Sequence, residues 1–306
     1  MLDVRTVRRG LLALYGAVFV WSFFVNGLPI ARLAVLSWVA AAVVIAHVGR
    51  PWRDQRRMTF DLTLYAAMWL SYDYSRGIAD SFDFPLQVEM PRNIDRVLFF
   101  GTDPNVWVQD VFHRDDTPWY EVILSLVYFT HFILPVAVAV VLWIRNRDQW
   151  VRYVRRFATV LFTGVLMFVL LPTAPPWMAA SKRHPYRILP PLERTTGRGW
   201  SELGLETVTS LLIRGQQWAN PTAAFPSLHA AFALLVVVFF WPRFTRRWQR
   251  ITAGSFPLLM AFSLVYFAEH YVADILAGWI LVAGSFWVWG RYERSRALPR
   301  SVSAQN

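Results

Sequence analysis

The sequence contains no cysteine, which excludes disulfide bonds, thiol nucleophiles and cysteine-ligated metal sites. Charged residues are also scarce, at 17% of the 306 residues, compared with about a quarter in ordinary soluble domains. Lys182 is the only lysine among 31 basic residues. Glycine-rich phosphate loops and the ligand spacing of a zinc site are both missing, so we expect neither a bound nucleotide nor a metal cofactor.

Apolar residues are abundant instead, at 56%, and aromatic residues reach 16% with 16 tryptophans, as is typical of helical membrane proteins. A helix needs about 17–25 residues to cross about 30 Å of hydrocarbon. Eight segments are apolar and long enough: 11–27, 31–48, 59–77, 119–144, 153–172, 225–241, 251–268 and 271–291. We therefore predict an all-α fold, a polytopic membrane bundle of about eight transmembrane helices, with an uncleaved first span.

Basic residues concentrate in alternate connections between these segments. The connections concerned are 1–10, 49–57, 145–156, 242–250 and 291–300. They hold 20 of the 31 basic residues, so the positive-inside rule predicts that both termini are cytoplasmic. Two long segments, 78–118 and 173–224, then lie outside: the first is expected to include an interfacial amphipathic helix, and the second to form a cap or substrate vestibule. Because the arginines lie between apolar runs, the net charge of +11 does not indicate a nucleic-acid partner.

Two short motifs carry ionisable side chains at the rims of apolar segments, where such groups are costly unless they have a function. They are Pro226-Ser-Leu-His229 and His270-Tyr-Val-Ala-Asp274. Asp274 follows His270 by one helical turn, so its carboxylate can accept from one ring nitrogen of His270. That bond fixes the tautomer and leaves the other nitrogen free to attack an electrophile or to move a proton.

The two motifs are predicted to lie on the same face of the membrane. Two spans of about 26 Å separate His229 from His270, so the chain goes across and returns to the same side. Each motif alone also fits a structural role, as an interfacial histidine or as a helix start capped near Ser227. Their conjunction favours catalysis, and the helix N-terminus that follows Pro226 favours an anion such as phosphate.

These motifs resemble the second and third motifs of the type 2 phosphatidic acid phosphatase superfamily, and most closely its branch of inositol phosphorylceramide synthases and inositolphosphotransferase-like proteins. Pro172-Thr-Ala-Pro-Pro-Trp177 is also similar to a stretch of that branch, and the resemblance covers about residues 153–291. It implies metal-independent phosphoryl transfer in which His270 is the nucleophile, Asp274 orients it and His229 protonates the departing oxygen.

The sequence departs from the phosphatase branch in its cations. We find no Lys…Arg-Pro first motif, and Leu264 stands where the third motif has an arginine. Other outer cations must then bind the phosphoryl group, and together with Ser227 we assign this role to Arg76, Lys182 and Arg183. Arg187, Arg194, Arg198 and Arg214 are further outer cations. The sphingolipid-synthase-like branch that the sequence resembles lacks these cations too, so the resemblance favours transfer over plain hydrolysis without excluding either.

We thus predict a lipid phosphotransferase or phosphatase of the cell membrane that acts on a phosphoryl-linked headgroup at the extracytoplasmic face through a phosphohistidine. The expected partners are a membrane lipid and an alcohol or water acceptor. We expect three parts. Residues 1–118 hold three spans and an extracytoplasmic segment, residues 119–291 form a phosphatidic acid phosphatase-like catalytic bundle, and residues 292–306 form a cytoplasmic tail. A phosphatase that uses only water, a transporter and an inactive scaffold are the alternatives.

The remaining histidines are assigned to structure. His131 lies inside the fourth apolar segment, where we expect it to contact another helix rather than a metal. His113, with Asp115 and Asp116 close by, fits a solvated turn.

Overall fold

The computed structural model describes residues 3–26, 32–78, 82, 84–182, 187–210 and 220–297. Its long helices are α1 (Val4–Asn26), α2 (Arg32–Ala46), α3 (Trp52–Ile78), α6 (Trp119–Arg145), α7 (Arg147–Leu170), α11 (Leu228–Phe240), α12 (Arg247–Tyr266) and α13 (Val272–Ala297). Short helices are α4 (Glu89–Leu98), α5 (Pro104–Phe112), α8 (Pro176–Ala179), α9 (Arg198–Glu202) and the 3₁₀ turn η2 (Trp241–Arg243). The all-α prediction is confirmed, and each of the eight predicted apolar segments overlaps one long helix.

The chain divides into two compact units, Met1–Asp73 and Tyr74–Asn306. In the first, α1 packs against α2 through Tyr15, whose hydroxyl donates to the carbonyl of Trp38, and through Phe19, whose ring meets the Trp38 ring edge-on. The division predicted at residues 118 and 291 remains a prediction.

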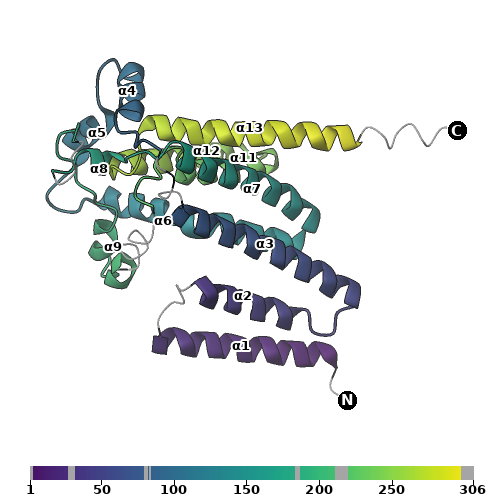
Figure 1. Ribbon diagram of the computed structural model, residues 1–306. Coiled ribbons are helices and arrows are strands. Elements are labelled where there is room, and N and C mark those ends of the chain that lie inside the picture. Colours follow the sequence, from purple (N-terminus) through teal and green to yellow (C-terminus); the bar gives the residue numbers. More distant parts are fainter. Residues whose placement is uncertain are drawn as a thin grey trace. The chain divides into compact units, whose positions relative to one another are not determined.

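The second unit is a helix bundle with α11 at its centre. Helix α11 packs against α6, α7, α12 and α13, and α13 runs along the bundle beside α7 (Figure 1). Apart from His229, every residue of α11 is apolar, and a helix that is apolar all round is stable only when neighbours surround it. Most of its residues are accordingly buried.

The outer faces of this bundle are apolar as well. Ile144 of α6, Leu166 of α7 and Ile280 of α13 are all more than half exposed, as is expected of side chains that face lipid. Three described helices are long and apolar enough to cross a membrane, namely α6, α7 and the Val272–Arg296 part of α13. Leu228–Arg243 is apolar but shorter. The total of eight spans remains a prediction.

Helices α4, α5, α8 and α9 gather at the end of the bundle where α13 begins (Figure 1). Helix α4 buries Pro91 and Asp95 and packs against α13, while its apolar Val97 and the following Phe100 are exposed. It is thus amphipathic, and its location at the membrane interface remains a prediction. Helix α5 packs against α12, and α9 packs against α6.

Candidate active site

His229 lies in the first turn of α11, which Ser227 caps. The Ser227 Oγ accepts from the backbone N–H of Ala230 at 3.3 Å, which satisfies one of the free donors of that turn. The predicted helix start is confirmed. Ser227 is completely buried, and its own N–H donates to the carbonyl of Asp274 at 2.9 Å, so the two motifs are joined through their backbones.

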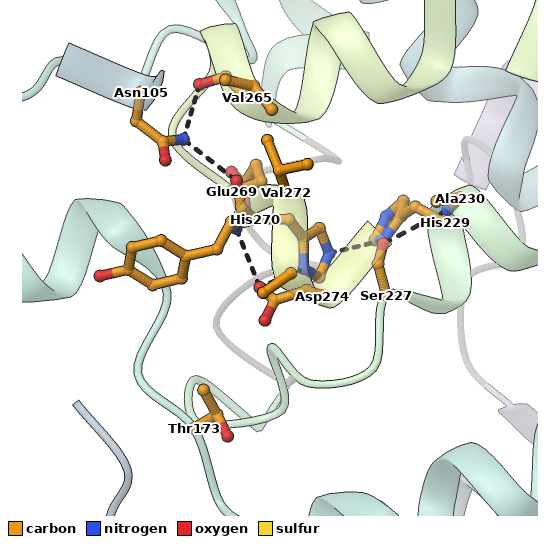
Figure 2. Close-up of polar contacts among 12 residues, drawn as sticks. Asn105, Thr173, Ser227, His229, Ala230, Val265, Glu269, His270, Val272 and Asp274 are labelled. Carbon is orange, nitrogen blue, oxygen red and sulfur yellow. Dashed lines mark hydrogen bonds and ion pairs between the residues drawn. The ribbon is translucent and has the colours of Figure 1, made fainter. Parts of the chain in front are cut away.

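His270 lies in the turn between α12 and α13, and Asp274 lies in the first turn of α13 (Figure 2). The Asp274 Oδ2 is 3.4 Å from Nδ1 of His270 and also accepts from the backbone N–H of Tyr271 at 2.9 Å. Asp274 is completely buried and His270 is 6% exposed. The predicted pairing of the carboxylate with one ring nitrogen is therefore present.

The two histidines meet directly. Nε2 of His270 is 3.4 Å from Nδ1 of His229, although 41 positions separate the residues (Figure 2). With Asp274 ionised, Nδ1 of His270 holds its proton against the carboxylate, so Nε2 presents a lone pair. That lone pair can accept from an Nδ1–H on His229. The arrangement thus places a nucleophilic nitrogen beside a proton donor.

Close approach of α11 and α13 makes this contact possible. At Gly278 of α13, an added Cβ would lie 2.4 Å from the carbonyl oxygen of Ser227, so only glycine fits there. Without this contact the two helix starts, and hence His229 and Asp274, could not lie so near each other.

The Pro172–Trp177 stretch connects both motifs. Thr173 pairs as an isolated bridge with Gln87 on one side and with Ala223, just before the His229 motif, on the other. The backbone N–H of Trp177 donates to the carbonyl of Ala268, two residues before His270. This stretch therefore supports both histidine-containing segments through its backbone.

Three polar side chains from α4 and α5, which sequence reasoning did not select, hold the turn that carries His270. Asn105 donates through Nδ2 to the carbonyls of Val265 at 2.9 Å and of His270 at 3.0 Å (Figure 2). Gln109 donates to the carbonyl of Tyr266 at 2.7 Å. Asp95 accepts from the first two N–H groups of α13, those of Val272 and Ala273, at 2.9 and 2.7 Å.

Asp95 is completely buried, and burial raises the pKa of its carboxyl to about 6, although the two backbone N–H groups oppose the shift. The negative charges of Asp274 and Asp103 raise this pKa further. Its position at the positive end of the α13 dipole suits the ionised form.

An ion pair lies immediately beside His270. Arg194 donates from Nε and Nη2 to the two carboxylate oxygens of Glu269, at 2.6 and 3.0 Å. Its guanidinium also lies over the Trp177 ring, 4.5 Å from the ring centre. Since Glu269 precedes His270 in the chain, this ion pair joins Arg194 to the residue next to His270.

Two aromatic rings of α6 pack on His229. The Tyr128 ring stacks at 5.0 Å between centres, and the His131 ring stacks at 3.8 Å. The prediction that His131 contacts another helix is confirmed, but that helix is the one that carries His229. Nothing in the sequence spacing relates these two histidines.

Of the three cations predicted to bind substrate, only Lys182 has a side chain among the described residues. Lys182 is exposed. Arg183 and the side chain of Arg76 lie outside the described residues, although Arg76 belongs to α3. Their roles remain predictions.

A comparison with protein families places this arrangement. The model of the PAP2 superfamily matches residues 93–288, more than half of the chain. The chain belongs to the PAP2 superfamily. One curated relative, the phosphoinositol dihydroceramide synthase of Bacteroides thetaiotaomicron, is 27% identical over 250 residues, which cover 79% of this chain and 79% of the relative. No solved structure matches the chain significantly.

Membership of the superfamily and this relative make the protein an enzyme, a lipid phosphotransferase or phosphatase of the membrane. The predicted resemblance to inositol phosphorylceramide synthases is confirmed. The matched region begins within α4. It includes the whole turn that carries His270 and the three residues whose side chains hold that turn, Asp95, Asn105 and Gln109.

Proposed function

We propose that the protein transfers a phosphoryl-linked headgroup between lipids through a covalent intermediate on His270. The observation that carries the proposal is the chain of contacts from Asp274 through His270 to His229 at 3.4 Å each. Such a chain supplies an oriented nucleophile and a proton donor in one place.

In the first step, Nε2 of His270 attacks the phosphorus atom of the donor lipid. The bond from phosphorus to the lipid alcohol breaks, and His229, which enters this step as the imidazolium, gives one proton to the departing oxygen and becomes neutral. Asp274 stabilises the positive charge that develops on the imidazole of His270. Because the rings of His229 and His270 are in contact, the phosphoryl group must approach Nε2 of His270 from beside the contact or move the two rings apart.

In the second step, an acceptor hydroxyl attacks the phosphorus. His229 takes the proton of that hydroxyl, the phosphorus–nitrogen bond breaks, and both histidines return to their first state. The relative's name supports a ceramide-type alcohol as acceptor and phosphoinositol as the transferred group. Water as acceptor would make the same site a phosphatase.

We assign the binding of the phosphoryl oxygens to Arg194, besides Ser227, Arg76, Lys182 and Arg183. Glu269 engages Nε and Nη2 of Arg194, and no partner of Nη1 is found in the described part of the chain. A guanidinium held along one edge offers its remaining N–H groups to an anion in a fixed direction. Arg194→Gln should raise the KM for the lipid substrate more than Arg198→Gln, a control whose side chain donates to backbone carbonyls nearby.

Turnover of purified variants tests the histidine roles. His270→Ala should abolish both the intermediate and turnover with inositol phospholipid and ceramide. His229→Ala should retain more activity with an activated aryl phosphodiester, whose leaving group needs less protonation. Intact-mass detection of an acid-labile adduct on the wild-type enzyme reports the intermediate. Rescue of His270→Ala by the aryl substrate, with His229→Ala inactive, would reverse the two assignments.

We place the site on the extracytoplasmic face, with both termini in the cytoplasm, on the strength of the arginine distribution. A single cysteine introduced at exposed Leu205 should react with an impermeant thiol reagent in intact cells, and one at exposed Thr245 should not. The opposite labelling pattern would move the active site to the cytoplasmic face.

A further inference from the structure

A cavity opens toward the opposite end of the bundle from the histidines. It has a volume of about 1080 Å³ and is formed between α7, α11, η2, α12 and α13. This volume reaches the upper end of the range usual for sites that bind small molecules, roughly 300–1,000 Å³. From His229 to Phe240, the last residue of α11, the helical rise is about 16 Å, so the mouth of this cavity lies at the other end of α11 from the histidines.

The cavity has a basic mouth and apolar walls. Arg152, Arg156 and Arg243 line it together with only one acidic residue, Glu293. Deeper along the helices, Leu234 and Val238 of α11, Leu258 of α12 and Trp279 of α13 form the walls. The division into a charged mouth and an apolar interior matches a molecule with an anionic head and a hydrocarbon tail.

One carboxylate, that of Glu293, interacts with two of the three arginines in this mouth. Arg156 forms a two-bond ion pair with Glu293, at 2.8 and 2.9 Å, and Arg152 acts on the same carboxylate through its charge. No hydrogen bond of the exposed Arg152 guanidinium is found within the described residues. Arg243 donates to the neutral Oε1 of Gln149 at 2.9 Å and to a backbone carbonyl. The mouth therefore holds a net positive charge.

We propose that this cavity, lined by Arg152, Arg243 and the apolar walls named above, binds one anionic phospholipid, with the headgroup at the arginines and an acyl chain against α11 and α12. Basic pockets between transmembrane helices are suited to such headgroups, because the phosphate gains charge-assisted hydrogen bonds while the chain stays in apolar surroundings. The bound lipid would fill the space between four helices of the catalytic bundle. The proposal concerns binding and is independent of turnover.

Native mass spectrometry of the full-length protein in detergent tests the proposal. We expect phosphatidylglycerol to bind at one saturable site and phosphatidylcholine to bind much more weakly. The double variant Arg152→Gln/Arg243→Gln should weaken phosphatidylglycerol binding on the order of thirtyfold, about fivefold for each arginine. Arg247→Gln is the matched control, because Arg247 is an exposed arginine at the same end that does not line the cavity, and it should bind as the wild type does.

A second pair of variants tests the cavity without altering charge. A Cβ at Gly254 of α12 would meet only Trp241, at 3.8 Å, so Gly254→Ala fits, whereas the longer side chain of Gly254→Leu extends into the cavity. Both changes favour the helix, so both proteins should fold. Gly254→Leu should lose the lipid and Gly254→Ala should keep it. Equal binding by the two variants, equal binding of phosphatidylcholine, or full competition by soluble glycerol phosphate would overturn the proposal.

Discussion

Asn105 provides the sharpest test of how the His270 turn is held. Its side chain is 1% exposed and donates two hydrogen bonds, to the carbonyls of Val265 and His270. Asn105→Ala removes both, at about 1 kcal/mol each, so we expect a loss of about 2 kcal/mol. Asn105→Asp keeps the shape but turns a donor into an acceptor that faces two carbonyl oxygens. The buried, unsatisfied group adds about 1–3 kcal/mol, for a total of about 4 kcal/mol.

The measurement is the thermal unfolding midpoint in detergent at a fixed scan rate, followed by tryptophan fluorescence. Asn146→Asp is the matched control, because Asn146 caps α7 by accepting from the N–H of Gln149, which an aspartate does equally well. We expect its midpoint to stay unchanged. Turnover of Asn105→Ala should also fall at temperatures where the protein remains folded, because the carbonyl of His270 loses the hydrogen bond from Asn105 that helps to fix its backbone.

Protonation adds a second criterion. The new carboxyl group of Asn105→Asp, once protonated, can donate to one of the two carbonyls, so the folded variant binds a proton more readily than the unfolded chain does. The stability of Asn105→Asp should therefore rise as the pH falls, relative to wild type. An Asn105→Asp midpoint equal to that of Asn146→Asp at neutral pH would show that the two hydrogen bonds do not hold the turn.

Two further results are expected. In the folded protein the pKa of Asp95 is raised from 3.8 to about 6, so its contribution to stability is fully present below about pH 4 and is lost as the pH rises through 6, by about 3 kcal/mol in total. Unfolding midpoints measured across that pH range should therefore fall less steeply for Asp95→Asn than for wild type. Parallel profiles of the two proteins would contradict this. Gly278→Ala should lower the free energy of unfolding by about 1–3 kcal/mol and reduce turnover, because its Cβ meets the Ser227 carbonyl. Gly284→Ala on the same helix has open space around its Cβ and should be neutral or slightly stabilising. Equal effects of the two substitutions on the unfolding midpoint would refute the close approach of α11 and α13.

The helices could be predicted from the sequence because their information is local. Long apolar runs form helices in a membrane, since every backbone group is then satisfied within the segment. The pairing of His270 with Asp274 is also local, because four positions make one turn. Even the prediction that His229 and His270 lie at the same end of the bundle follows from counting two predicted crossings between them.

The support of the site could not be predicted in this way. Asn105 and Asp95 are polar residues in a loop-rich segment, where no periodic pattern distinguishes a buried side chain from a solvated one. The sequence indicated that 78–118 lies outside the apolar spans, but only the packing of α4 on α13 and of α5 on α12 brings these residues to the His270 turn.

What the sequence by itself determined is the set of long helices and the two histidine motifs, because apolar length and helical spacing are properties of short segments. Only the tertiary structure decided which distant groups complete the site. Arg194 reaches Glu269 across 75 positions, and His131 stacks on His229 from another helix. Such contacts depend on how separate segments pack, and packing is fixed by the shape of the whole bundle rather than by the order of residues in one segment.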